Sequence, residues 1–151
     1  MLTFFLWACY FFRGRRSCET QLAVTYHDLA ELNDQMLQVD IGILDFSKAF
    51  DVVPHTRLLN KLKFYGLSEE VISWIREFLH ERKQKVMVDG VFSQEEKVDS
   101  GVPQGTVLGP LLFLLFINDI PDGLTSGTRI RLFADDCLVY RPIRSPADST
   151  E

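Results

Sequence analysis

Apolar positions along the chain recur at two different spacings, which predict a mixture of helices and short strands. A helical spacing predicts a helix over 19–33. The residues that recur at helical spacing along it are Leu22, Tyr26, Leu29 and Ala30. Partial alternation with β-branched residues over 39–46 predicts a strand, and this apolar run carries Asp45 at its end.

The rest of the chain continues this mixed pattern. The expected elements are helices over 56–65 and 69–79, a hairpin of 84–88 with 91–98, a helix over 108–120, and strands over 130–134 and 137–140. Gly66 is expected to end the first of these helices and Ser68 to cap the second. Asp89-Gly90 between two extended runs is a strong hairpin signal. Because strands and helices do not alternate strictly, the order predicts an α+β fold, with an antiparallel sheet and helices packed on one face.

Composition is that of an ordinary globular protein, with 46% hydrophobic and 25% charged residues in 151. The net charge of −5 has the wrong sign for a self-sufficient nucleic-acid binder, which usually has a basic face. Three cysteines without metal-binding spacing argue against a zinc site or a disulfide framework and favour a reducing compartment. The apolar run 1–12 is too short to span a bilayer. We expect it to be a buried segment or the start of a truncated gene, and the protein to be intracellular.

Three carboxylates stand at the ends of predicted strands. Asp45 ends one strand, and Asp135 and Asp136 join two others about 90 residues later. If those strand ends are neighbours, three negative charges converge and require a positive partner, for which Mg²⁺ is suited. Two such ions about 4 Å apart are the arrangement that promotes in-line phosphoryl transfer. Taken alone, each carboxylate is more often an ordinary turn or cap residue.

Four motifs around these carboxylates point to one family. In chain order they are LDFSKAFD at 44–51, SGVPQG at 100–105, LGPLLF at 108–113 and FADD at 133–136. Together they resemble the reverse transcriptase family, and more closely the enzymes of non-LTR retrotransposons (long interspersed elements). The resemblance covers about 13–144, and RSCETQL at 16–22 is similar to the segment that precedes the first aspartate motif in that group.

The resemblance implies a role for each matching carboxylate and its neighbour. Asp45, Asp135 and Asp136 match the family's catalytic, metal-binding aspartates, which would hold two Mg²⁺ ions, with Mn²⁺ as a possible substitute. The backbone carbonyl of Phe46 would be a further ligand.

The resemblance also implies a nucleotide-binding loop. Gln104 and Gly105 match the loop that lies against the incoming nucleotide and template. Phe50 matches the aromatic beneath the nucleotide sugar, where a bulky ring leaves no room for a 2′-hydroxyl. Ala134 stands where RNA-synthesising relatives tend to have glycine, so both positions favour DNA synthesis. The alternative for Phe50 is a core aromatic.

The fold implied is a polymerase palm with a ferredoxin-like core over 39–144. Residues 1–38 would be a remnant of the fingers with a connecting helix, 145–151 a frayed tail, and fingers and thumb would be largely missing. The function implied is RNA-directed DNA polymerase, which adds deoxynucleoside triphosphates to a primer 3′-hydroxyl on an RNA template. Without the basic template clamps, the chain alone is not expected to polymerise DNA measurably.

Two alternatives remain at this stage. The chain could be a non-catalytic remnant of a mobile element. It could also be a nucleic-acid-binding module, which predicts exposed aromatics on the central strands and a basic surface. We expect two further features to have structural roles. His55 is expected to help start a helix. The basic residues Arg82, Lys83 and Lys85 are expected to form a solvated face, with contact to a nucleic-acid backbone as the second possibility.

Overall fold

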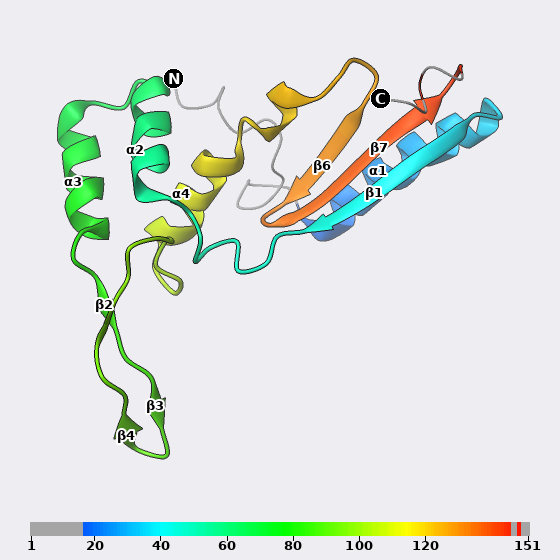
Figure 1. Ribbon diagram of the computed structural model, residues 1–151. Helices are drawn as coiled ribbons and strands as arrows, with labels where there is room; N and C mark the ends of the chain where they lie inside the picture. The colour runs from blue at the N-terminus through cyan, green and yellow to red at the C-terminus, as the bar shows by residue number, and fades with distance from the viewer. Residues whose placement is uncertain (1–16, 146–147, 149–151) are drawn as a thin grey trace. The chain divides into compact units, whose positions relative to one another are not determined.

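The computed structural model describes residues 17–145 and 148, and the chain divides into two compact units (Figure 1). The first unit consists of residues 1–47 and 117–151, and the second consists of residues 48–116. The first contains α1 (Cys18–Asp34), β1 (Gln38–Asp45), the 3-10 helix Ile120–Gly123, β6 (Arg129–Phe133) and β7 (Asp136–Ile143). The second contains α2 (His55–Phe64), α3 (Glu69–Leu79), β2 (Lys83–Gln84), β3 (Met87–Val88), β4 (Val91–Phe92), β5 (Glu96–Lys97) and all but the last residue of α4 (Leu108–Ile117).

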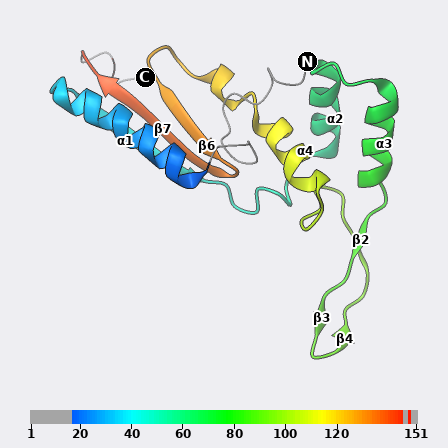
Figure 2. The ribbon, with the colours of Figure 1, turned by 180° about the vertical axis from the view of Figure 1, so that it is seen from behind.

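The first unit is built on a three-stranded antiparallel sheet in the order β1-β7-β6. The central strand β7 pairs with β1 from Gln38 opposite Ile143 to Asp45 opposite Asp136. It pairs with β6 up to Phe133, which is also opposite Asp136. Helix α1 runs along one face of this sheet (Figure 2). The α+β class predicted from the sequence is therefore confirmed, while a ferredoxin-like core remains a prediction.

Helix α1 extends one residue beyond the predicted bounds at each end, and the residues at helical spacing do not form its buried face. Leu22 and Tyr26 are 69% and 74% exposed. The buried residues of the helix are Gln21, Thr25, Asp28 and Leu32. This buried face is mainly polar because Asp28 has charged partners in the sheet.

Asp28 fastens α1 to both strands of the β6–β7 hairpin. Its Oδ2 accepts hydrogen bonds from the Arg131 guanidinium and from the hydroxyl of Tyr140, and its Oδ1 lies 3.2 Å from Nη1 of Arg129. Burial by itself would raise the pKa of Asp28, but these hydrogen bonds and the two arginine charges outweigh it and hold the pKa below its usual value. Burial, together with the hydrogen bond to Asp28, raises the pKa of Tyr140.

The second unit packs α2 against α3. The buried side chains of the pair are Leu58, Leu62, Ile72, Ile75 and Leu79. Gly66 has φ +78 just beyond α2, and the Ser68 side chain accepts a hydrogen bond from the backbone N–H of Val71, so both predicted helix boundaries are confirmed.

A long ribbon leads away from α3 and returns to the loop before α4 (Figure 1). Asp89 and Gly90 at its tip both have positive φ, as a type I′ turn requires, so the predicted hairpin is confirmed. Its regular pairing is shorter than predicted, with two residues in each of the four strands. Conversely, β7 is longer than predicted, β6 has the predicted length but begins and ends one residue earlier, and α4 ends at Ile117 and not at residue 120.

The apolar run 1–12 lies outside the described residues. Among 17–145 and 148, no helix has both the length and the apolar character needed to cross a membrane.

We predict that Asp28→Asn lowers the free energy of unfolding by roughly 2 kcal/mol, because it weakens charge-assisted bonds to three side chains at once. The change would be measured by urea unfolding at pH 7. Asp34→Asn is the matched control, since Asp34 is exposed on the same helix and should change stability by less than about 0.5 kcal/mol.

The effect of Asp28→Asn should also depend on pH with a defined sign. Because the folded-state pKa of Asp28 is lowered, its contribution is fully present above the unfolded value of about 3.9 and is lost as pH falls below it. The difference between wild type and variant should therefore be constant from pH 7 to pH 5 and shrink below pH 4. A difference that grows on acidification would contradict this assignment.

Candidate active site

The pairing of β1 with β7 sets two of the three predicted carboxylates against each other. Asp45 is the last residue of β1 and Asp136 the first of β7, and the register makes them direct partners. Facing residues of an antiparallel pair have Cα atoms about 4.5–5.5 Å apart and point to the same face of the sheet. Asp135 directly precedes Asp136 in the turn from β6. The structure thus brings together chain segments that are about 90 residues apart in sequence.

The turn that carries Asp135 is tight and strained. Only Ala134 and Asp135 separate Phe133 from Asp136, which are paired. Ala134 has φ +53 while Asp135 keeps a negative φ, the combination of a type II′ turn. A non-glycine residue at the first turn position costs about 1 kcal/mol relative to glycine. The two flanking strand pairings hold the turn in this conformation.

The facing carboxylates have no basic partner among residues 17–145 and 148. Asp45 and Asp136 are exposed and Asp135 is half-buried, and none of the three takes part in an ion pair with a described side chain. Arg129 and Arg131 lie on the same face of the sheet but bind Asp28. Like charges directly opposite in a sheet are destabilising, so a cation from solution would relieve the repulsion.

The chemistry of this donor set fits a hard divalent cation, because carboxylate oxygens are the ligands that Mg²⁺ prefers. The side chains of the three carboxylates do not, however, form a complete metal site. Within the described part of the chain, no group of three or more His, Cys, Asp or Glu is placed to hold a metal ion. The facing pair of Asp45 and Asp136 is the part of the predicted cluster that the strand register fixes.

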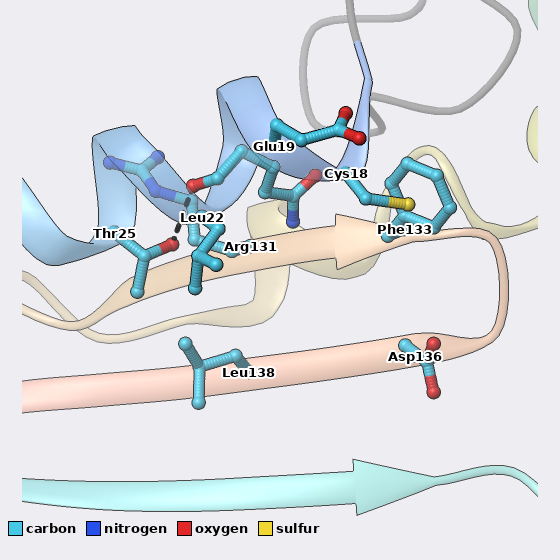
Figure 3. Close-up of a pocket in the computed structure, with 9 residues that line it drawn as sticks. Cys18, Glu19, Leu22, Thr25, Arg131, Phe133, Asp136 and Leu138 are labelled. Atoms are coloured by element: carbon cyan, nitrogen blue, oxygen red, sulfur yellow. Dashed lines mark hydrogen bonds between the residues drawn. The ribbon is translucent and has the colours of Figure 1, made fainter.

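A groove of about 400 Å³ lies beside Asp136, between the start of α1 and the β6–β7 hairpin (Figure 3). Its walls are mainly apolar, and Figure 3 shows Phe133 and Cys18 on one side with Leu138 further along β7. Asp136 therefore stands at the boundary between solvent and an apolar recess.

The predicted nucleotide-binding residues lie in the second unit, where residues 100–105, here called the nucleotide loop, are bonded to the segment that follows Asp45. Gln104 Nε2 donates to Oδ1 of Asp51 over 3.1 Å, and Ser100 Oγ donates to the Asp51 carbonyl over 2.8 Å. The backbone N–H of Val102 donates to the carbonyl of Phe50 over 2.8 Å. The LDFSKAFD and SGVPQG motifs thus form one bonded structure.

Phe50 is half-buried and stacks on Phe113 of α4, with ring centroids 4.1 Å apart and an angle of 22° between the planes. The ring is therefore held in place from one side. This packing is compatible with both interpretations of Phe50, as a gate under a sugar and as a core aromatic.

Two glycines of the nucleotide loop share a positive φ but differ in their surroundings. Gly101 has φ +85, and a Cβ placed on it would lie 2.6 Å from the carbonyl oxygen of Asp51. Gly105 has φ +78 with nothing within 4 Å of such a Cβ. Gly101 is required by close approach, whereas Gly105 is open to solvent and accessible to a ligand.

The sequence interpretation missed four residues that organise these features. Asp28 anchors the carboxylate hairpin, and Asp51 receives the side chains of the nucleotide loop. His55 and Arg82, interpreted as a helix start and a solvated residue, both bind the carbonyl of Gly101. For Asp28 a signal existed in the polar positions 21, 25 and 28, which recur at helical spacing; for His55 and Arg82 no local pattern reveals a carbonyl partner so distant in sequence.

Comparison with known proteins agrees with these features. The family model for reverse transcriptase (RNA-dependent DNA polymerase) matches residues 8–149, so this chain belongs to the reverse transcriptase family. It is 41% identical to the RNA-directed DNA polymerase from mobile element jockey of Drosophila funebris over 114 residues. This match covers 72% of this chain and 12% of that protein.

Two further relatives come from Drosophila melanogaster. The probable RNA-directed DNA polymerase from transposon X-element is 38% identical, and the match covers 65% of this chain and 11% of that protein. The probable RNA-directed DNA polymerase from transposon BS is 32% identical, and the match covers 74% of this chain and 12% of that protein. The resemblance to the polymerases of non-LTR retrotransposons is confirmed. The chain spans about 12% of the length of the relatives it matches.

We predict that Gly101→Ala destabilises the protein by at least about 3 kcal/mol, because it adds a clash with the Asp51 backbone to the strain of a positive φ. Gly105→Ala is the matched control and should cost only the backbone strain, about 1–2 kcal/mol. Chemical unfolding of the two variants measures the difference. Equal effects would show that the contact between the loop and Asp51 is looser than described.

Proposed function

We propose that this chain carries the catalytic palm of an RNA-directed DNA polymerase, with the palm spanning 39–144. The observation that carries the proposal is the register that makes Asp45 and Asp136 direct partners on neighbouring strands. The reaction would be attack of a primer 3′-hydroxyl on the α-phosphorus of a deoxynucleoside triphosphate, with RNA as template. Membership of the reverse transcriptase family supports this choice of substrates.

The carboxylates of Asp45, Asp135 and Asp136 would hold the divalent cations, with the carbonyl of Phe46 as a further ligand. Bound Mg²⁺, or Mn²⁺ in its place, would lower the pKa of the attacking hydroxyl and offset charge on the phosphates. The contribution of the protein is then positioning. The tight turn and its paired flanks hold Asp136 opposite Asp45 before any ligand arrives, so little reorganisation is needed on binding.

Selection of the nucleotide would fall to Phe50, Gln104 and Gly105. The Phe50 ring is held from behind by Phe113, so it cannot move away from a 2′-hydroxyl without breaking that stack. Gln104 and Gly105 are exposed at the surface of the nucleotide loop, where a ligand can reach them. These features support a preference for deoxynucleotides.

The alternative of an RNA-binding module has less support. That function would need exposed aromatics on the central strand, but Tyr140 of β7 is 1% exposed and bonded to Asp28. The net charge of −5 also opposes it. A non-catalytic remnant would keep the same fold, so only measurement separates it from a competent palm.

Cation binding tests the proposal directly. We expect wild type to bind Mn²⁺ in a calorimetric titration, and Asp45→Asn and Asp136→Asn to weaken binding by at least tenfold, because each removes one of two facing ligands. Without metal, both variants should be slightly more stable than wild type, by about 0.5 kcal/mol, since a like-charge pair is removed. Asp40→Asn is the matched control, because Asp40 is an exposed carboxylate of β1 on the opposite face. Binding that survives in either site variant would refute the proposed ligand set.

Activity of the isolated chain is a separate question. Because the chain spans about 12% of its relatives' length, we expect it to show no measurable primer extension on an RNA template, with no difference from Asp135→Ala. Processive extension that is lost in Asp135→Ala would show that the palm alone holds template and primer, contrary to this expectation.

A further inference from the structure

We propose that His55 and Arg82 are positioning residues for the nucleotide loop. By binding the carbonyl of Gly101, they fix the position of Gln104 relative to Phe50. That relative position in turn determines how well the site discriminates between deoxynucleotides and ribonucleotides. This inference rests on the proposed function and assigns the two side chains a part in its specificity.

Two side chains from different elements converge on the same carbonyl oxygen. His55 Nε2, at the first residue of α2, lies 2.8 Å from the Gly101 oxygen. Arg82 Nη1, from the segment after α3, donates to the same oxygen over 3.2 Å. Both side chains are part-buried, and a carbonyl oxygen has two lone pairs, so the pair saturates it.

Both side chains form their hydrogen bonds away from the segments that carry them. The N-cap of α2 is Pro54, which makes no side-chain cap, and the His55 ring is directed instead to a partner 46 residues away in sequence. Arg82 lines a polar recess together with the carboxylates of Asp51 and Asp99, yet it binds the neutral carbonyl of Gly101 and forms no ion pair with a described carboxylate. The hydrogen bond of Arg82 therefore connects it to the nucleotide loop.

The carbonyl that they hold belongs to a peptide that is tied on both sides. The N–H of Gly101 donates to the Val53 carbonyl and the N–H of Val102 donates to the Phe50 carbonyl, each over 2.8 Å. The Gly101 backbone passes so close to Asp51 that no side chain fits between them. A shift of this peptide would move the Phe50 backbone directly.

The same shift would reach the polar end of the loop. Gln104 lies three residues beyond Gly101, and its Nε2 donates to Asp51, the residue next to Phe50. Gln104 and Phe50 are therefore linked through one short bonded network whose fixed point is the Gly101 carbonyl. If the ring of Phe50 excludes a 2′-hydroxyl, the precision of that exclusion depends on this fixed point.

The test uses the 151-residue chain with three variants and two controls. His55→Leu and Arg82→Met each remove one donor, and His55→Gln keeps a donor near the Nε2 position. His80→Leu and Arg76→Met are the controls, because both residues are exposed at the end of α3 and neither side chain is a donor to the Gly101 carbonyl. None of these positions is among the proposed cation ligands or nucleotide contacts.

The first readout is amide hydrogen exchange by NMR. We expect His55→Leu and Arg82→Met to accelerate exchange at Gly101 and Val102 by roughly five- to tenfold, the effect of losing one hydrogen bond, while the amide of Ile75 in α3 is unchanged. His55→Gln and both controls should leave all three amides as in wild type. Unchanged exchange at Gly101 and Val102 in His55→Leu would overturn the inference.

The second readout is the ratio of the dissociation constants for ATP and dATP in the presence of Mn²⁺, measured by calorimetry. We expect wild type to favour dATP, and His55→Leu and Arg82→Met to reduce that preference at least threefold, with rescue in His55→Gln. Faster exchange with an unchanged ratio would overturn the specificity role and leave a merely structural contact. If wild type binds neither nucleotide, the proposed function fails together with the specificity role, whereas the exchange data still decide whether the two residues anchor the loop.

Discussion

The antiparallel pairing of β1 with β7 is the constraint on which the candidate site depends. It places Asp45 opposite Asp136 although the sequence separates them by about 90 residues, and it does so at an energetic cost, because like charges face each other. The arginines that could relieve that cost are bound by Asp28 on the same face of the sheet. The proposed divalent cation would supply the charge that this pair of carboxylates lacks.

Each unit contains one polar anchor that fixes a loop carrying candidate chemistry. In the first, Asp28 joins α1 to both strands of the hairpin that presents Asp136. In the second, the Gly101 carbonyl receives His55 and Arg82 beside the loop that carries Gln104. Both anchors are buried or part-buried, so their hydrogen bonds are shielded from water and more directional than surface contacts would be. Backbone strain is found in the turn of the hairpin that Asp28 holds, where the non-glycine residue Ala134 has a positive φ, as is common where structure serves a site.

The sequence predicted most of the local structure because local rules govern it. The turn at Asp89-Gly90, the cap at Ser68 and the strand that ends in Asp45 depend on residues within a few positions of one another, and all were found. The buried face of α1 was missed because a charged partner in the sheet, not apolar periodicity, decides which side of that helix packs inward. The roles of His55 and Arg82 were missed for the same reason, since their shared partner is defined only by the folded loop. The motifs named the carboxylates, but only the strand register could show that two of them face each other.

The central claim is that the carboxylates at the end of β1 and the start of β7 share one divalent cation. Paramagnetic broadening of amide resonances by substoichiometric Mn²⁺ tests it most directly, because broadening falls steeply with distance from the ion. The account predicts that the amides of 44–46 and 135–137 broaden together at the same Mn²⁺ concentration, before those of other acidic segments. Broadening confined to one of the two segments, or centred on another acidic stretch such as 95–99, would contradict it.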